Sequence, residues 1–228
     1  MDGPIYKLMA QDGNAQREIT VDVRGSASTS RSRPGAGLER VLTKVLRNPV
    51  LEIKDVVDFG AGKFKNVPFI LGEGKNVCAV EFDKASLDQI TEENLSKSRK
   101  FGVRFRSMNP RQFMANPSKF DLALLANVIS TMPLIDERRE MLELLHTKLR
   151  DGKFLLWFAQ KREKHYAERR EKGKVCGDGV WLGDGRQAQT FYRYFSPEEM
   201  HRHMHSAGFV PFDKFSVETN HAFLYQRT

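Results

Sequence analysis

Residues 55–83, DVVDFGAGKFKNVPFILGEGKNVCAVEFD, contain two short apolar runs that we predict to be neighbouring parallel strands. The first run ends in Asp58 and is followed by a turn with Gly60 and Gly62, and the second run ends in Glu81. Glycines let a ligand approach the backbone closely, and an acid about 20 residues farther on can accept hydrogen bonds from both hydroxyls of a ribose. The stretch therefore predicts a site for an adenosine-containing cofactor.

The glycine spacing favours one class of cofactor. A dinucleotide site has a third glycine that lets the helix pack beside the pyrophosphate, but Lys65 stands at that position here. The segment DFGAGKF instead resembles motif I of the class I S-adenosylmethionine (SAM) methyltransferases, D/E-x-G-x-G-x-G, with Phe64 in place of the last glycine. SAM has no pyrophosphate, so its site has less need of the third glycine. An NAD-dependent oxidoreductase, whose dinucleotide site uses that glycine, is therefore the less favoured alternative.

The resemblance to this family continues, in the family's order, over about residues 50–225. Five further segments carry it: VEFD (80–83), FGVRFRSMN (101–109), FDLALLANVISTM (120–132), LRDGKFLLWF (149–158) and YFSPEEMHRHMHSAGF (194–209). Lys153 replaces the second glycine of the family's L-x-x-G-G entry to its fifth strand. Each motif is weak alone, and the specificity lies in their order and spacing.

By resemblance, the cofactor is SAM, and its binding residues lie at the ends of the first four strands. They are Asp58, Gly60, Ala61, Gly62, Glu81, Phe82, Met108, Asn109 and Asn127. The family places Glu81 on the ribose, Phe82 beside the adenine, and Met108 or Asn109 near the adenine amino group.

Apolar patterns alternate between strand and helix, which indicates a parallel sheet covered by helices. The predicted strands are 56–59, 76–80, 103–106, 121–126 and 153–159, with helices over 84–99 and 134–149 and a closing hairpin over 209–226. The resemblance implies a doubly wound, mostly parallel seven-stranded α/β sheet with a C-terminal antiparallel hairpin and helices on both faces. We predict an N-terminal arm over 1–37, a SAM-binding domain over 38–228, and a substrate lid inserted at about 160–195.

The predicted catalytic residues are Asn127, Ser130 and Arg193. Asn127 ends the fourth strand, where the family holds the methyl group, but it also suits an ordinary strand-end cap. Ser130 and Thr131 either line the same pocket or cap the helix that follows. We predict no metal site, because His201, His203 and His205 point in different directions on a helix.

Six residues are predicted to bind the substrate: Arg31 and Arg33 of the arm, and Trp181, Arg186, Tyr192 and Tyr194 of the lid. Aromatic side chains interleaved with arginines suit stacking on a base or ring. The alternative is a lid whose aromatic residues form a core of their own.

The formal net charge is +8, and the basic residues are clustered. Residues 97–111 contain six basic side chains and no acid, and residues 161–174 contain seven basic side chains against three acids. Such clusters can neutralise phosphates and give salt-dependent affinity for nucleic acid. Solvated helix faces are the alternative for each cluster.

Two absences narrow the acceptor. Enzymes that methylate amino groups of adenine or cytosine usually carry [D/N/S]-P-P-[F/Y] after the fourth strand, where this chain has Asn127-Val128-Ile129-Ser130. Enzymes that methylate carbon 5 of cytosine need a cysteine there, and neither Cys78 nor Cys176 fits. Both nucleobase classes are disfavoured.

The sequence thus predicts a SAM-dependent methyltransferase that acts on a nucleic acid or another anionic acceptor. A small-molecule methyltransferase and an inactive SAM-binding or nucleic-acid-binding module are the alternatives, and the oligomeric state is left open. No apolar run is long enough for a membrane span, and the first residues do not resemble a secretory signal. We expect a cytoplasmic protein whose two cysteines are reduced.

Overall fold

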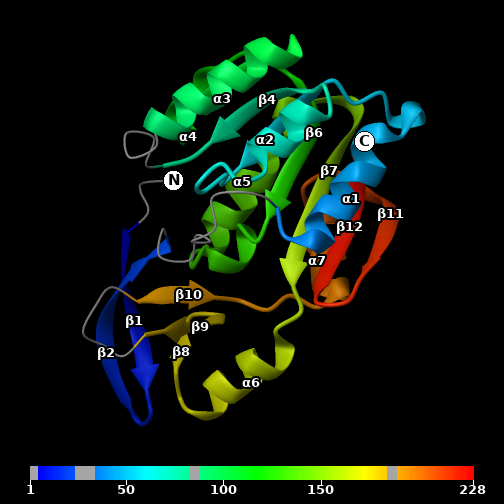
Figure 1. Ribbon diagram of the computed structural model, residues 1–228. Coiled ribbons are helices and arrows are strands. Elements are labelled where there is room, and N and C mark those ends of the chain that lie inside the picture. The colour runs from blue at the N-terminus through cyan, green and yellow to red at the C-terminus, as the bar shows by residue number, and fades with distance from the viewer. Residues whose placement is uncertain (1–4, 24–33, 83–87, 184–188) are drawn as a thin grey trace.

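The computed structural model describes residues 5–23, 34–82, 88–183 and 189–228. Its centre is a seven-stranded sheet in the order β11-β12-β7-β6-β3-β4-β5 (Figure 1). These strands are β3 (Asp55–Phe59), β4 (Asn76–Val80), β5 (Phe105–Met108), β6 (Phe120–Ala126), β7 (Leu149–Gln160), β11 (Phe209–Val217) and β12 (Asn220–Arg227). Strands β3 to β7 are parallel, whereas β12 runs antiparallel to β7 and to β11. The predicted fold class is confirmed.

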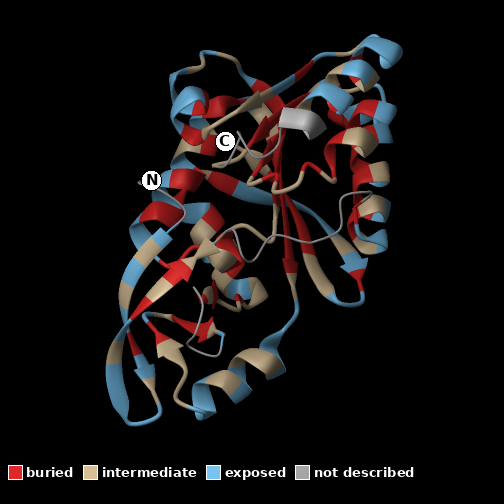
Figure 2. Ribbon diagram, turned by 60° about the vertical axis from the view of Figure 1, so that its left-hand side comes forward, coloured by how far each residue is buried: buried red, intermediate tan, exposed pale blue. Residues whose placement is uncertain are grey.

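Helices cover both faces of this sheet, and the strands between them are buried (Figure 2). One core contains side chains of α1 (Ala36–Arg47) and α2 (Val67–Gly72), with α3 (Asp88–Phe101) packed at its margin. The other contains side chains of α4 (Pro110–Ala115), α5 (Ile135–Lys148) and α7 (Pro197–Ser206). Alternate residues of each strand feed the two cores, as the two-residue period of a strand requires.

Local signals explain where several helices begin. Asn109 and Ser196 each form a capping box, with Gln112 and Glu199 respectively, and a proline follows each cap. Helix α1 approaches β11 closely, because a Cβ atom on Gly37 would lie 2.7 Å from Cγ1 of Val217. The sequence predicted the helix that contains His201, His203 and His205, which is α7, and the closing hairpin of β11 and β12. The short helices α2 and α4 were not predicted.

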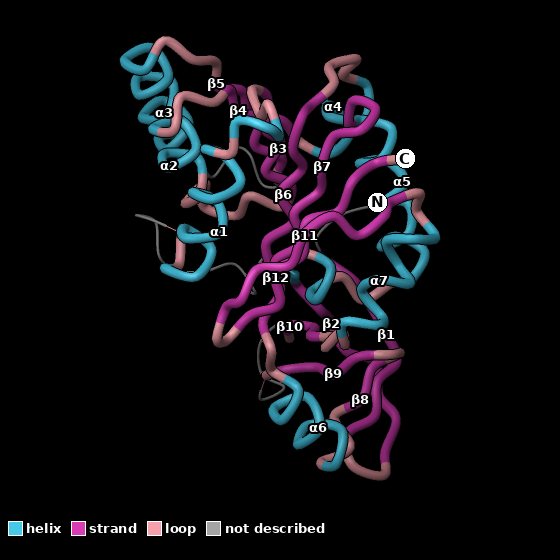
Figure 3. The backbone as a smooth tube through the Cα atoms, turned by 90° about the vertical axis from the view of Figure 1, so that its right-hand side faces the viewer, coloured by secondary structure: helices cyan, strands magenta, loops and turns pink. Residues whose placement is uncertain are grey.

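A small lobe lies beside the carboxyl end of the sheet (Figures 1 and 3). It consists of the hairpin β1 (Ile5–Asp12) and β2 (Ala15–Asp22), helix α6 (Glu163–Glu171), and β8 (Val175–Cys176), β9 (Gly179–Leu182) and β10 (Thr190–Tyr192). Ile19 and Val21 of the hairpin share a core with Trp181 and Phe191 of the insertion. Two backbone hydrogen bonds to Gln189 join β2 to the segment before β10. The N-terminal segment and the insertion, far apart in sequence, thus pack as one lobe.

A buried ion pair ties the lobe to α5. The guanidinium of Arg138, only 1% exposed, donates to both carboxylate oxygens of Asp178 at 2.8 and 2.6 Å. Tyr6 of β1 also donates to Glu137 of α5, at 2.5 Å. Among the helices of the described residues, none is long and apolar enough to cross a membrane.

Candidate functional site

The carboxyl ends of β3, β4, β5 and β6 bring the predicted cofactor residues to one edge of the sheet. Asp58 is the next-to-last residue of β3, Glu81 directly follows β4, and Asn127 directly follows β6. Met108 is the last residue of β5, and its carbonyl accepts a hydrogen bond from the Glu81 amide at 3.0 Å. In open α/β sheets, ligands bind outside the carboxyl ends of the strands. This edge is therefore the candidate site.

The glycine turn after β3 folds back onto the end of β4. The amides of Gly60 and Ala61 both donate to the carbonyl of Val80, at 2.9 and 3.1 Å. Gly60 and Gly62 have φ angles of 69° and 55°, a region that favours glycine. A Cβ atom on Gly60 would lie 2.6 Å from Cγ2 of Val128, so the loop after β6 rests against this turn.

Phe64 occupies the position of the motif's last glycine and keeps the backbone conformation of a glycine. Its φ angle is 56°, which is uncommon for a bulky residue. The side chain is 1% exposed, and its ring packs edge-on against Phe105 with centroids 6.1 Å apart. Burial of a large aromatic side chain offsets backbone strain of order 1–3 kcal/mol. The departure from the family's motif thus leaves the left-handed turn in place.

Glu81 links the turn to the next strand through its carboxylate. One oxygen accepts from the amide of Gly62 at 2.7 Å, and the other accepts from the amide of Phe82 at 2.8 Å. Backbone amides thus hold both carboxylate oxygens at the carboxyl end of β4, beside the glycine turn.

Asp58 is a buried acid whose carboxyl group receives long hydrogen bonds from one side chain. It is 1% exposed, and the Asn66 amide contacts its two oxygens at 3.2 and 3.4 Å. Burial raises the pKa of Asp58 to about 7, the nearby Glu81 adds to the rise, and the Asn66 hydrogen bond opposes it. The carboxyl group is therefore partly protonated at neutral pH, and a cationic group beside it would favour ionisation.

Asn127 joins the ends of β6 and β7. Its amide donates to the carbonyl of Phe158 at 2.8 Å, and its side-chain oxygen accepts from the amide of Gln160 at 3.1 Å. The φ angle of 62° is one that asparagine tolerates better than most residues. Asn127 thus acts as a cap at the end of β6, which was one of the two predicted roles. Within the described residues its Nδ2 group has no hydrogen-bond partner.

Three tyrosines and a histidine gather next to the end of β7. The Tyr194 ring lies 6.2 Å from His221 and 6.4 Å from Tyr166, and Tyr166 lies 6.3 Å from Tyr192. The Tyr192 hydroxyl donates to the carbonyl of Gln160 at 3.2 Å. The Asn127 side chain also contacts Gln160. The insertion therefore places an aromatic cluster beside Asn127.

His221 is the member of this cluster that sequence reasoning missed. Its Nε2 atom is buried and has no hydrogen-bond partner among the described residues. Burial lowers the pKa of His221, and Lys161 and Lys214 lower it further. The neutral imidazole is thus the form at physiological pH. His221 is the second residue of β12, and the register that pairs it with Ala159 sets it beside the site.

The other predicted residues hold the scaffold together in this structure. Arg193 forms ion pairs with Glu199 and with Asp178, and its amide donates to the carbonyl of Ser130 at 2.8 Å. Trp181 is 1% exposed within the lobe core. Asn109 is engaged by its capping box, and Asn116 donates to the sulfur of Met108 at 3.1 Å. Arg31, Arg33 and Arg186 lie outside the described residues.

No protein-family model matches the sequence, and no curated protein matches it. Solved structures do match. A SAM-dependent methyltransferase from Methanosarcina mazei is 14% identical, with a TM-score of 0.57 over 82% of this chain and 96% of that one. The 1,6-didemethyltoxoflavin-N1-methyltransferase of Burkholderia thailandensis, solved with its substrate and S-adenosylhomocysteine (SAH), is 21% identical, with a TM-score of 0.57 over 85% and 79% of the two chains.

A third match is the magnesium protoporphyrin IX methyltransferase of Synechocystis PCC 6803, solved with bound SAH. It is 14% identical and has a TM-score of 0.56, with 84% of each chain covered. At these identities the likeness concerns the fold. The fold implied by the sequence motifs and the fold found by comparison are the same.

Proposed function

We propose that this chain, which has the fold of the class I SAM-dependent methyltransferases, binds SAM and transfers its methyl group to an anionic acceptor. One observation carries the proposal. Glu81 spans the glycine turn and the end of β4 with one carboxylate, at 2.7 Å from the Gly62 amide and 2.8 Å from the Phe82 amide. This arrangement holds a carboxylate at the point where a fold of this kind binds the ribose of an adenosine.

The residues at this edge fit SAM. Glu81 would accept the ribose hydroxyls, Phe82 would border the adenine, and Gly60 and Gly62 would let the ligand approach the backbone. Asp58, whose pKa burial raises to about 7, would be drawn to its ionised form by the positive charge of the cofactor. Bound SAM supplies an activated methyl group on a sulfonium, so the protein mainly aligns the two reactants.

We place the acceptor beside Asn127, Tyr194 and His221. Asn127 would offer its free Nδ2 group, and Tyr194 would offer a half-buried ring. The buried Nε2 of His221 would gain a hydrogen bond from an acceptor group, and as a neutral imidazole it could take a proton from that group. The lobe formed by the arm and the insertion would act as the lid over this acceptor.

The charge of the lid supports a negatively charged acceptor. Arg162, Lys164 and Lys172 are exposed, and none of them has an ion-pair partner among the described residues. Trp181 and Tyr192, in contrast, are buried in this structure and present no flat face for a base. The combination favours a small anionic molecule. A nucleic acid is the second candidate, because the basic clusters would also contact phosphates.

The first test is calorimetric titration of the protein with SAH. We expect binding that Glu81→Ala weakens by about tenfold or more, since hydrogen bonds to a charged group contribute about 1.5–3 kcal/mol. Glu73→Ala is the matched control, because Glu73 pairs with Arg47 at the opposite end of the sheet. Unchanged affinity in Glu81→Ala would contradict the proposed site.

An acceptor screen with labelled SAM then separates an enzyme from a binding module. It compares small carboxylates and phosphate esters with DNA and RNA oligonucleotides. We expect label transfer that His221→Gln reduces while SAH affinity stays unchanged. SAH binding without transfer to any of these classes would favour the inactive module, and binding of NAD without SAH would favour an oxidoreductase.

A further inference from the structure

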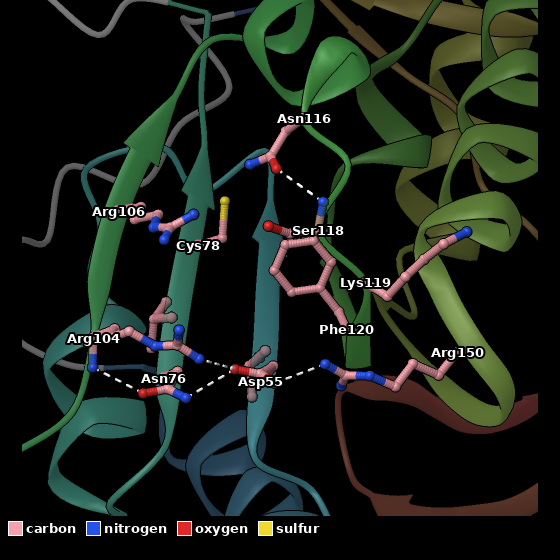
Figure 4. A pocket seen from close by; sticks show the side chains of 12 residues that line it. Asp55, Asn76, Cys78, Arg104, Arg106, Asn116, Ser118, Lys119, Phe120 and Arg150 are labelled. Atoms are coloured by element: carbon pink, nitrogen blue, oxygen red, sulfur yellow. Dashed lines mark hydrogen bonds and ion pairs between the residues drawn. The ribbon is translucent and has the colours of Figure 1, made fainter.

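A cavity lies at the opposite end of the sheet from the proposed cofactor site. A cavity of about 230 Å³ is lined by the amino ends of β3, β4 and β6 and by the edge strand β5. Asp55 begins β3, Asn76 begins β4 and Phe120 begins β6 (Figure 4). Asp55 and Phe59 are four residues apart, which separates this cavity from the glycine turn by about 13 Å of strand.

Four basic side chains and one acid line the cavity. The cations are those of Arg104, Arg106, Lys119 and Arg150, and the acid is Asp55. Arg150 also forms a 2.6 Å ion pair with Asp121, just outside the lining. Even with this second acid counted, the excess positive charge around the cavity is two.

Asp55 fixes two of these cations in place. Its oxygens lie 3.3 Å from Arg104 and 3.0 Å from Arg150, and Asn76 donates to it at 2.8 Å. Burial opposes ionisation of Asp55, but the hydrogen bonds from Asn76 and Arg150 outweigh it and the pKa lies below its usual value. The carboxylate is therefore charged at neutral pH, and it holds both guanidinium groups at one side of the cavity lining (Figure 4).

Lys119 donates to the carbonyl of Thr147, whereas two other lining donors have no acceptor in the described part of the chain. Arg106 and the hydroxyl of Ser118 have no hydrogen-bond or ion-pair partner among the described residues, and both line the cavity. The thiol of Cys78 lies beside Arg106 (Figure 4). Burial raises its pKa to about 12, although Arg106 lowers it. The Cys78 thiol is thus an uncharged part of the cavity lining. The guanidinium of Arg106 also lines the cavity, and no carboxylate of the described residues pairs with it.

We propose that this cavity binds a phosphate group. Guanidinium groups match the oxygens of phosphate with paired hydrogen bonds, and the Ser118 hydroxyl can add another. Arg104 and Arg150, held by Asp55, supply fixed positive charge on one side of the cavity. On the other side, the guanidinium of Arg106 supplies hydrogen-bond donors. The phosphate belongs either to a small phosphate ester or to a nucleic-acid backbone.

Calorimetric titration with inorganic phosphate, at low ionic strength, tests the proposal on the full-length protein. We expect one saturable site, whose Kd rises by about tenfold or more in Arg106→Gln, since one charge-assisted hydrogen-bonding group is lost. Arg111→Gln is the matched control, because Arg111 is an exposed arginine of the same basic run outside the cavity. Saturation with SAH should leave phosphate binding unchanged.

Two further arms identify the source of the phosphate. A short single-stranded oligonucleotide that competes with inorganic phosphate would identify a nucleic-acid backbone, and competition by phosphoserine alone would identify a small ester. Three results would overturn the proposal: no saturable phosphate binding, equal weakening in Arg106→Gln and Arg111→Gln, or displacement of phosphate by SAH. The last result would place the anion in the proposed cofactor site, and failure of SAH binding alone would leave the phosphate site intact.

Discussion

Asp58 is the residue at which folding and the proposed cofactor binding meet. Its carboxyl group is buried and has no cationic partner in contact within the described ranges, and its pKa of about 7 exceeds the usual 3.8. A folded state with a raised carboxyl pKa binds more protons than the unfolded state between these two values. The free energy of unfolding therefore falls as pH rises from about 4 to about 7.

The raised pKa of Asp58 predicts that Asp58→Asn changes how the free energy of unfolding depends on pH. Between pH 5 and pH 8 the wild-type protein should lose about 2–3 kcal/mol more unfolding free energy than the variant, at 1.36 kcal/mol per pKa unit. Urea unfolding of both proteins at the two pH values measures the difference. Asp136→Asn is the control, since Asp136 is exposed on α5. Parallel losses in wild type and Asp58→Asn would contradict the raised pKa.

At the residue scale, the sequence identified the acids and glycines of the site but not their hydrogen bonds. Asp58, Gly60, Gly62 and Glu81 stand out because acids and glycines interrupt apolar runs at the predicted strand ends. The left-handed conformation of Phe64 could not be predicted, because it depends on a ring contact with Phe105. The same holds for His221, which long-range strand register places beside Tyr194.

The elements of the sheet were the most predictable part of the fold. Strands β3, β4 and β6 are mostly apolar and largely buried, and such runs are read directly from sequence. Strand β5 is shifted by two residues from its predicted range of 103–106, because its alternating arginines give no clear boundary at this edge. The hairpin of β1 and β2 escaped prediction, since its apolar partners lie in the insertion about 170 residues away.

Helix α5 connects the lobe to the sheet through Arg138, and this link predicts a strong asymmetry between two substitutions. Asp178→Ala leaves the guanidinium of Arg138 buried without its partner, which costs about 3–5 kcal/mol of unfolding free energy. Arg138→Met leaves Asp178 partly exposed and still beside Arg193, so the loss should be smaller. Chemical denaturation of the two variants measures both losses.

A surface pair on the same helix provides the control for this comparison. Arg139 and Asp136 form an exposed ion pair, for which Asp136→Ala should change stability by about 0–1 kcal/mol.

Burial opposes ionisation of Asp178, but Arg138 and Arg193 outweigh it and hold the pKa of Asp178 low. The stability that Asp178 contributes is therefore present above its pKa in the unfolded chain and is lost only as the pH falls below that value. Equal effects of Asp178→Ala and Asp136→Ala at pH 7 would contradict a stabilising role of the buried pair.

At the scale of the whole molecule, two cores are continuous with the sheet and a third belongs to the lobe. The third core joins Ala10, Ile19 and Val21 of the hairpin to Cys176, Trp181 and Phe191 of the insertion. Trp181 donates to the carbonyl of Gln11 at 2.8 Å, and Arg17 lies over its ring at 4.9 Å. The lobe therefore depends on the hairpin, whereas the proposed cofactor residues depend on the strands of the sheet.

This division predicts that removal of residues 1–23 opens the lobe and leaves the sheet folded. The chain has two tryptophans, Trp157 in the sheet and Trp181 in the lobe, so fluorescence can follow each region. Trp181 should become exposed and shift the emission to longer wavelength, while the same truncation of Trp181→Phe should keep the emission of buried Trp157. Ile19→Asp, which places a charge in the lobe core, should reproduce the shift without truncation. Because backbone groups at the ends of β3 and β4 hold Glu81 and the glycine turn, SAH affinity should change little. Exposure of Trp157 in the truncated protein would show instead that the lobe and the sheet fold as one unit.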